Sequence, residues 1–209
     1  MSQVKEAEIK ILDPAEPESF YLNKDWYIGS ITLGSELQLN NCPFKVNLKE
    51  NTLLVKLNEK TWVIEDKEVD SFEWTNGKTN KKEYFVNANN FNLNVSRTSG
   101  FFQITNQGKY KLLVKHVLIE KDSFNPAMPN LGSTLSYTAI EQFYVDNSEK
   151  TILFEKNKKD ILLIFDKKPT EVDNFIKENK IKIREAEDLA RVFNFYNSIT
   201  ENLASEGKN

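Results

Sequence analysis

Residues 44–48 of this chain alternate strictly between apolar and polar side chains. Their sequence is Phe44-Lys45-Val46-Asn47-Leu48, and an extended backbone places the three apolar side chains on one face of a pleated sheet. Similar runs follow at intervals of roughly eight to ten residues, separated by turn-forming pairs such as Glu50-Asn51 and Asn58-Glu59. This spacing predicts an antiparallel β-meander.

The predicted meander covers most of the sequence. Its longest strand carries apolar side chains on both faces over residues 109–120, so we expect this strand to be central. A tight turn is expected at residues 75–78, because Asn76 and Gly77 tolerate the positive φ of a two-residue hairpin. The predicted strands are residues 20–22, 26–33, 44–48, 53–57, 61–65, 69–74, 84–86, 101–104, 109–120, 135–145, 152–154 and 161–165.

The hydrophobic period changes near residue 170, where the first of two amphipathic helices is predicted. Thr170 is a good N-cap and the apolar residues after it share one face, which predicts a helix over about residues 170–179. Acidic residues followed by apolar residues at spacings of three and four predict a second helix over about residues 185–203. We expect this second helix to pack on the sheet.

Together these patterns predict a mainly β (α+β) fold. An antiparallel β-meander, arranged as a sandwich or a partly open barrel, is followed by the two C-terminal amphipathic helices. Residues 1–18 are expected to form an extended leader, residues 19–204 a single β-rich domain, and residues 205–209 a polar tail.

Charge and composition argue against a nucleic-acid partner and against a transmembrane segment. The formal net charge is −3 over 209 residues, so the chain lacks the basic character of a nucleic-acid-binding protein. Hydrophobic residues make up 39% of the sequence, which is typical of a soluble globular protein, and no apolar run is long enough for a transmembrane helix. We therefore expect no nucleic-acid partner and no transmembrane segment, and the oligomeric state is left open.

No catalytic or cofactor-binding motif is found in the sequence. The single cysteine, Cys42, cannot form an internal disulfide, and the single histidine, His116, cannot anchor a zinc site alone. His116 shares a predicted strand face with apolar residues, which indicates packing. Cys42 falls in a predicted turn, where catalysis would need His116 as its base. We expect no catalytic residue, no metal site and no cofactor.

Four aromatic residues are the candidates for a binding surface. Trp26, Trp62, Trp74 and Tyr137 are of the types that line carbohydrate or lipid sites and form hot spots of protein interfaces. The alternative is that they pack in the core and on the sheet faces.

A recurrent pattern links several segments between residues 20 and 200. They are Phe44-Lys45-Val46-Asn47-Leu48 leading to Leu53-Leu54-Val55-Lys56, Val69-Asp70-Ser71-Phe72, Gly108-Lys109-Tyr110-Lys111-Leu112-Leu113, and the stretch from Phe175-Ile176-Lys177 through Asp188-Leu189 to Phe195-Tyr196-Asn197-Ser198. This pattern resembles that of uncharacterised exported proteins of Bacteroidetes-type, especially flavobacterial, bacteria. The resemblance carries over no catalytic residue, and it implies a periplasmic or cell-surface location if an export signal was removed; otherwise the location is cytoplasmic.

Three functions are compatible with the sequence. The leading hypothesis is a non-enzymatic extracytoplasmic module that binds another envelope protein, as an accessory subunit of a cell-envelope assembly. The first alternative is a binding protein for a small apolar or carbohydrate ligand. The second is a hydrolase that uses paired carboxylates, although nothing in the sequence selects two of the 31 acidic residues.

Overall fold

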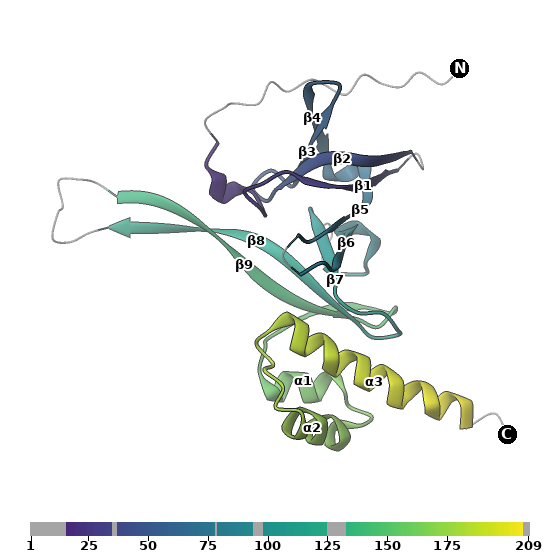
Figure 1. Ribbon diagram of the computed structural model, residues 1–209. Coiled ribbons are helices and arrows are strands. Elements are labelled where there is room, and N and C mark those ends of the chain that lie inside the picture. Colours follow the sequence, from purple (N-terminus) through teal and green to yellow (C-terminus); the bar gives the residue numbers. More distant parts are fainter. Residues whose placement is uncertain (1–15, 35–36, 78, 94–97, 125–132, 207–209) are drawn as a thin grey trace. The chain divides into compact units, whose positions relative to one another are not determined.

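The computed structural model describes residues 16–34, 37–77, 79–93, 98–124 and 133–206 (Figure 1). These residues form ten strands, in mainly antiparallel order, and three α-helices that follow the strands. The mainly β fold with C-terminal helices is therefore confirmed. Most of the predicted leader, residues 1–15, and the end of the predicted tail, residues 207–209, lie outside the described residues.

The chain divides into two compact units. Unit 1 comprises Met1–Lys82, Ser99–Phe101 and His116–Glu141, and unit 2 comprises Glu83–Thr98, Phe102–Lys115 and Gln142–Asn209. The sequence predicts a single domain over residues 19–204, and both units include parts of that stretch. Two long strands, β8 (Lys111–Phe124) and β9 (Ser133–Asp146), contribute residues to both units.

Unit 1 is built on five strands in the order β5-β1-β2-β3-β4. Strands β1 to β4 form a meander, and β5 returns to pair with β1 on its other side. Asn51, Asn58 and Glu59 have positive φ in the two predicted turns between β2 and β4. The strands are β1 (Tyr27–Leu33), β2 (Gln38–Asn47), β3 (Thr52–Leu57), β4 (Lys60–Glu65) and β5 (Val69–Thr75).

Strands β1 and β5 approach closely at one glycine. A Cβ atom on Gly29 would lie 2.0 Å from the carbonyl oxygen of Glu73 and 3.0 Å from the ring of Phe44. Since no real side chain tolerates such a contact, only glycine allows this pairing. Beside it, fully buried rings of Phe44 and Phe72 pack edge to face with centroids 5.6 Å apart and form part of the unit 1 core.

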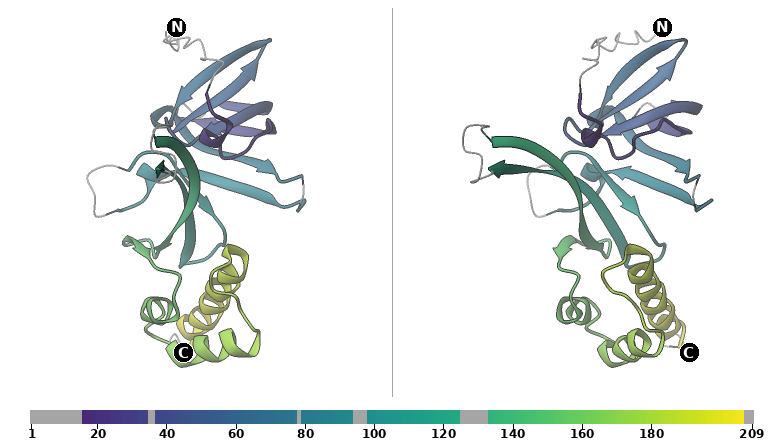
Figure 2. Two further views of the ribbon diagram at one scale, coloured as in Figure 1. Left: turned by 90° about the vertical axis from the view of Figure 1, so that its left-hand side faces the viewer. Right: turned by 60° about the vertical axis from the view of Figure 1, so that its left-hand side comes forward.

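Unit 2 combines short strands with all three helices, which Figure 2 shows gathered together. Its core brings apolar residues of β8 and β9 together with one face of the longest helix, where Leu189, Val192, Phe193 and Tyr196 are fully buried. The elements are β6 (Lys82–Asn87), β7 (Phe101–Ile104), β10 (Thr151–Phe154), α1 (Lys158–Ile164), α2 (Pro169–Glu178) and α3 (Ala186–Glu206), with the inner ends of β8 and β9.

Helix α1 corrects the sequence prediction, which placed a strand at residues 161–165. Asn157 caps the helix, because its side-chain oxygen accepts a hydrogen bond from the backbone amide of Asp160 at 2.9 Å. Ile161 and Phe165, four residues apart, are fully buried, whereas Leu163 is 67% exposed. The run is apolar at every position, so its sequence alone could not distinguish a strand period from a helix period.

Two smaller corrections concern the ends of elements. Helix α2 begins at Pro169 with Lys168 as its N-cap residue, so Thr170 is not the cap; proline favours the first helical position. The strand predicted at residues 20–22 is a 3₁₀ turn, Glu18–Phe20, followed by a single bridge between Tyr21 and Asn47. The amide of Phe20 donates to the carbonyl of Pro17 at 3.0 Å, which turns the chain before it can extend.

Candidate functional site

The four candidate aromatic residues occupy different environments within unit 1. Trp74 is 3% exposed and stacks on Tyr27 with ring centroids 4.5 Å apart, so it belongs to the core. Trp62 lies on β4 opposite Val55 of β3 and is partly exposed. These two tryptophans lie on strands of the unit 1 sheet.

Tyr137 of β9 belongs to a small aromatic contact of its own. Its ring packs edge to face on Phe20 with centroids 4.8 Å apart, and the ammonium of Lys49 lies 4.4 Å from the Phe20 ring and 5.6 Å from the Tyr137 ring. A hydrogen bond to Glu120, together with burial, raises the pKa of the Tyr137 hydroxyl. The structure therefore does not bring Tyr137 into ring contact with any of the three tryptophans.

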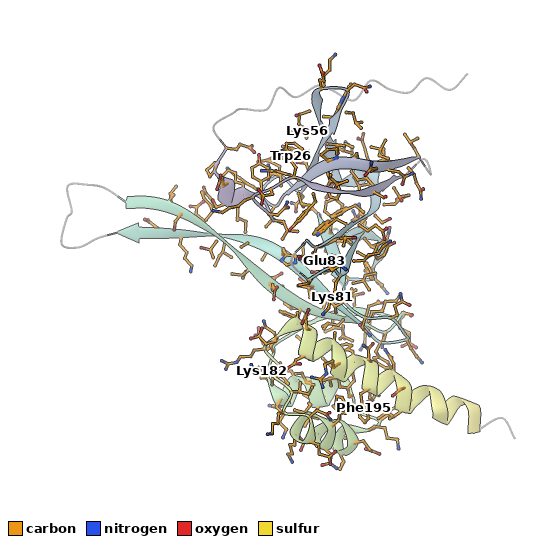
Figure 3. The ribbon with its side chains drawn as sticks, in the orientation of Figure 1. Trp26, Lys56, Lys81, Glu83, Lys182 and Phe195 are labelled. Atoms are coloured by element: carbon orange, nitrogen blue, oxygen red, sulfur yellow. The ribbon has the colours of Figure 1, made fainter. Side chains whose placement is uncertain are left out.

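Trp26 is the candidate whose ring lies near two lysine ammonium groups. The ammonium of Lys56 lies 4.1 Å from the centroid of its ring and the ammonium of Lys45 lies 5.7 Å from it. Lys45 also lies 5.2 Å from the ring of Tyr21. All three distances are typical of cation–π contacts. We call these four residues, Tyr21, Trp26, Lys45 and Lys56, the lysine–tryptophan surface, and Figure 3 labels Trp26 and Lys56 in it.

The register of β2 and β3 explains why the two lysines meet. Lys45 lies opposite Leu54, and Lys56 follows Leu54 by two residues. Because side chains alternate between the faces of a sheet, both lysines lie on the same face, opposite to the one that buries Phe44 and Val55. Trp26 immediately precedes β1, the other neighbour of β2, which brings its ring next to both lysines.

Hydrogen bonds fix the surroundings of the lysine–tryptophan surface. The hydroxyl of Tyr21 donates to a carboxylate oxygen of Glu16 at 2.6 Å, and the side-chain amide of Asn47 donates to the same oxygen at 3.0 Å. Burial and this carboxylate raise the pKa of Tyr21, so the hydroxyl keeps its proton. The ammonium of Lys45 donates to the backbone carbonyl of Lys24. The Tyr21 ring and the Lys45 ammonium are thus held in place.

The positive charges of this surface are not neutralised within the described part of the chain. Some lysines of unit 1 have carboxylate partners; Lys82 lies 2.9 Å from Glu73 and Lys24 lies 3.4 Å from Glu18. By contrast, no carboxylate among the described residues forms an ion pair with Lys45 or Lys56. The surface therefore presents two ammonium groups on an aromatic base.

Cys42 and His116 occupy sites that suit packing. Cys42 lies on β2, not in the predicted turn, and is 4% exposed; burial raises the pKa of its thiol, which disfavours the reactive thiolate. His116 lies on β8, and burial lowers its pKa to about 4, so the imidazole is neutral at pH 7.

Comparison with protein-family models, curated proteins and solved structures finds no match. Within the described ranges, no three histidine, cysteine, aspartate or glutamate side chains are grouped as metal ligands would be. The helices described are each too short or too polar to cross a membrane. The lysine–tryptophan surface is thus the candidate functional site.

Sequence reasoning found Trp26 but missed Lys45 and Lys56. Both lysines occupy polar positions of neighbouring predicted strands, and such positions are ordinarily solvent-facing. The signal that could have found them is the alternation itself, because it places the two lysines on one face once the strands are paired.

Proposed function

We propose that this chain is a non-enzymatic module that binds another protein through the lysine–tryptophan surface. The observation that supports this function is the pair of lysine ammonium groups that lie at Trp26 without a carboxylate partner among the described residues. Tryptophan is enriched among the residues that dominate binding energy at protein interfaces. A partly exposed tryptophan already held between flanking groups loses little side-chain entropy on binding.

A photo-crosslinking experiment can test this function, because two neighbouring residues of β4 lie on opposite faces. Thr61 pairs with Lys56 and shares its face, whereas Lys60 pairs with Leu57 and lies on the other face. A photoreactive residue replaces Thr61 in one version of the protein and Lys60 in another, and both are expressed in the source cells. We expect a discrete protein adduct from position 61 and none of the same mass from position 60.

A second variant links the adduct to the proposed surface. Adding Trp26→Leu to the version that crosslinks from position 61 should abolish the adduct while leaving the far-UV circular dichroism spectrum unchanged. An adduct that persists in the Trp26→Leu protein, or that forms equally from both positions, would contradict the proposed function.

We further propose that the module acts outside the cytoplasm, as an accessory subunit of a cell-envelope assembly. Support for this location comes from the resemblance to exported flavobacterial proteins described above. Fractionation of the source cells, with mass spectrometry of the native N-terminus, tests it. Recovery of the protein in the periplasmic or surface fraction is expected, and recovery in the cytoplasm alone would overturn it.

A further inference from the structure

We infer that the partner bound at the lysine–tryptophan surface presents an acidic segment, with aspartate or glutamate side chains that meet Lys45 and Lys56. This inference rests on the proposed function and adds the chemistry of the partner. It follows from the placement of the two ammonium groups, from the residues that hold them, and from the kinds of anion that such a surface can accept.

The two ammonium groups are close enough to act together. The ammonium nitrogens of Lys56 and Lys45 lie 4.1 and 5.7 Å from the centroid of the Trp26 ring, so they lie within about 10 Å of each other. This separation is about one Debye length at 0.1 M salt. Their mutual repulsion is therefore only partly screened. An anionic group placed between them relieves this repulsion and gains attraction from both, which favours a ligand with negative charge.

The side chains are also partly ordered before a ligand arrives. Lys45 has a backbone hydrogen bond to Lys24 and lies over two aromatic rings, and Lys56 lies over one. A lysine side chain free in solvent loses rotamer entropy when it is fixed. Part of that cost has already been met in the folded protein, so binding of a carboxylate at these positions is favoured over binding at an unconstrained lysine.

Carboxylates fit this surface better than phosphates do. Specific phosphate recognition commonly uses the bidentate guanidinium of arginine or the backbone amides of a helix N-terminus. The lysine–tryptophan surface contains no arginine, and its strands offer no helix N-terminus. The point charges of two lysines suit separate carboxylates on a peptide.

An acidic peptide is also favoured over an acidic polysaccharide. Aromatic side chains in sugar-binding sites offer an open ring face on which the apolar face of a sugar packs. Here the ammonium of Lys56 lies 4.1 Å from the centroid of the Trp26 ring and occupies the space over it. The lysine must therefore leave that face of the ring before a sugar can pack on it, whereas a peptide carboxylate can bind the ammonium where it stands.

Fluorescence anisotropy with the full chain tests the inference. The probe is a labelled oligoglutamate peptide, with oligoglutamine of equal length as the uncharged peptide and oligogalacturonate as the anionic sugar. We expect oligoglutamate to bind at least tenfold more tightly than oligoglutamine. The double variant Lys45→Gln with Lys56→Gln should weaken oligoglutamate binding at least tenfold, and binding by the unmodified chain should weaken as salt increases.

Two control variants make the result specific. Lys60→Gln removes an exposed lysine from the opposite face of the same hairpin and should change the affinity less than twofold. The double variant Lys45→Arg with Lys56→Arg keeps the charge and the cation–π contacts and should retain most of the affinity. Loss of affinity in the arginine variant equal to that in the glutamine variant would overturn a role for charge.

Three outcomes separate this inference from the proposed function. If the crosslinked partner is lost on Trp26→Leu but oligoglutamate does not bind, the proposed function stands and the acidic segment is wrong. If oligogalacturonate binds at this surface, oligoglutamate does not, and no Trp26-dependent protein adduct forms, both proposals fail. If oligoglutamate binds equally to the unmodified chain and to the Lys45→Gln, Lys56→Gln variant, the inferred site is wrong.

Discussion

Asn197 on α3 holds the loop between β7 and β8 in unit 2, and its replacement by alanine should weaken that unit strongly. The side chain is 5% exposed and makes three hydrogen bonds to the loop backbone. Its oxygen accepts from the amide of Tyr110 at 2.9 Å, and its amide donates to the carbonyls of Gln107 at 3.1 Å and Tyr110 at 2.8 Å.

The expected loss follows from which groups keep a partner. The carbonyls of Gln107 and Tyr110 also accept from the side-chain amide of Asn106, at 3.0 and 2.9 Å, so they remain paired. The partly buried amide of Tyr110 loses the partner that Asn197 provides, which places its cost toward the lower end of the about 1 to 3 kcal/mol of an unpaired buried donor. With the net loss of the other two bonds, Asn197→Ala should lower the free energy of unfolding by about 2 to 4 kcal/mol.

Urea unfolding can assign this loss to unit 2. All three α-helices of the described chain belong to unit 2, so circular dichroism at 222 nm reports mainly on that unit. All three tryptophans belong to unit 1, so tryptophan fluorescence reports on the other. A loss of about 3 kcal/mol moves the midpoint of the helix transition down by about 1 M or more, for typical urea m-values.

The matched control is Asn194→Ala, an exposed position on the same helix. Asparagine to alanine raises helix propensity by a few tenths of a kcal/mol at either site, so the control corrects for that gain. If the two variants unfold with free energies within about 0.5 kcal/mol of each other, the hydrogen bonds of Asn197 do not stabilise the loop and the reasoning is refuted.

Three further predictions follow from single side chains. Gly29→Ala places a Cβ atom 2.0 Å from the carbonyl oxygen of Glu73, so it should lower the free energy of unfolding of unit 1, followed by tryptophan fluorescence, by about 3 kcal/mol or more. In the control Gly77→Ala the added Cβ atom meets no atom within 4 Å, so this variant should not lower the stability of unit 1. Ile161→Ala, at a fully buried position of α1, should lower the free energy of unfolding by about 2 to 5 kcal/mol by circular dichroism; an equal effect of Leu163→Ala, 67% exposed, would contradict the helical assignment of the run. Burial lowers the pKa of His116 from 6.5 to about 4, so between these pH values only the unfolded chain takes up a proton. The stability that the neutral imidazole contributes is therefore fully present above pH 6.5 and is lost as the pH falls toward 4. After a discount for partial exposure, the free energy of unfolding should fall by about 2 kcal/mol over this range. His116→Gln should remove that part of the pH dependence of the free energy of unfolding, measured with urea between pH 7 and pH 4. If the variant keeps the same pH dependence, His116 titrates normally in the folded protein.

Turn chemistry and alternation let the sequence locate most of the strands. Asn51 and Asn58 tolerate positive φ and have positive φ in the structure. They lie in the turns that join β2 to β3 and β3 to β4, which pair as neighbours. Residues 101–104 form a strand with the bounds that the sequence predicts. These features are local, because they depend on the backbone preferences of a few neighbouring residues.

The run at residues 161–165 shows where local information ended. An unbroken apolar run fits a strand covered on both faces as well as a buried helix. The choice of helix depends on the cap at Asn157 and on the packing of Ile161 and Phe165 among residues from β8, β9 and α3. Those partners are distant in the sequence, so the outcome required the tertiary structure.

The candidate site likewise depends partly on local sequence and partly on the tertiary structure. By itself the sequence determined that Lys45 and Lys56 occupy polar positions of two strands and that Trp26 begins a third predicted strand. Only the tertiary structure decided that β1, β2 and β3 are neighbours, which brings two ammonium groups to one ring and leaves Trp62 and Trp74 elsewhere. Side-chain alternation is a property of each strand, whereas the pairing of strands is set by the free energy of the whole unit, and cation–π contact depends on both.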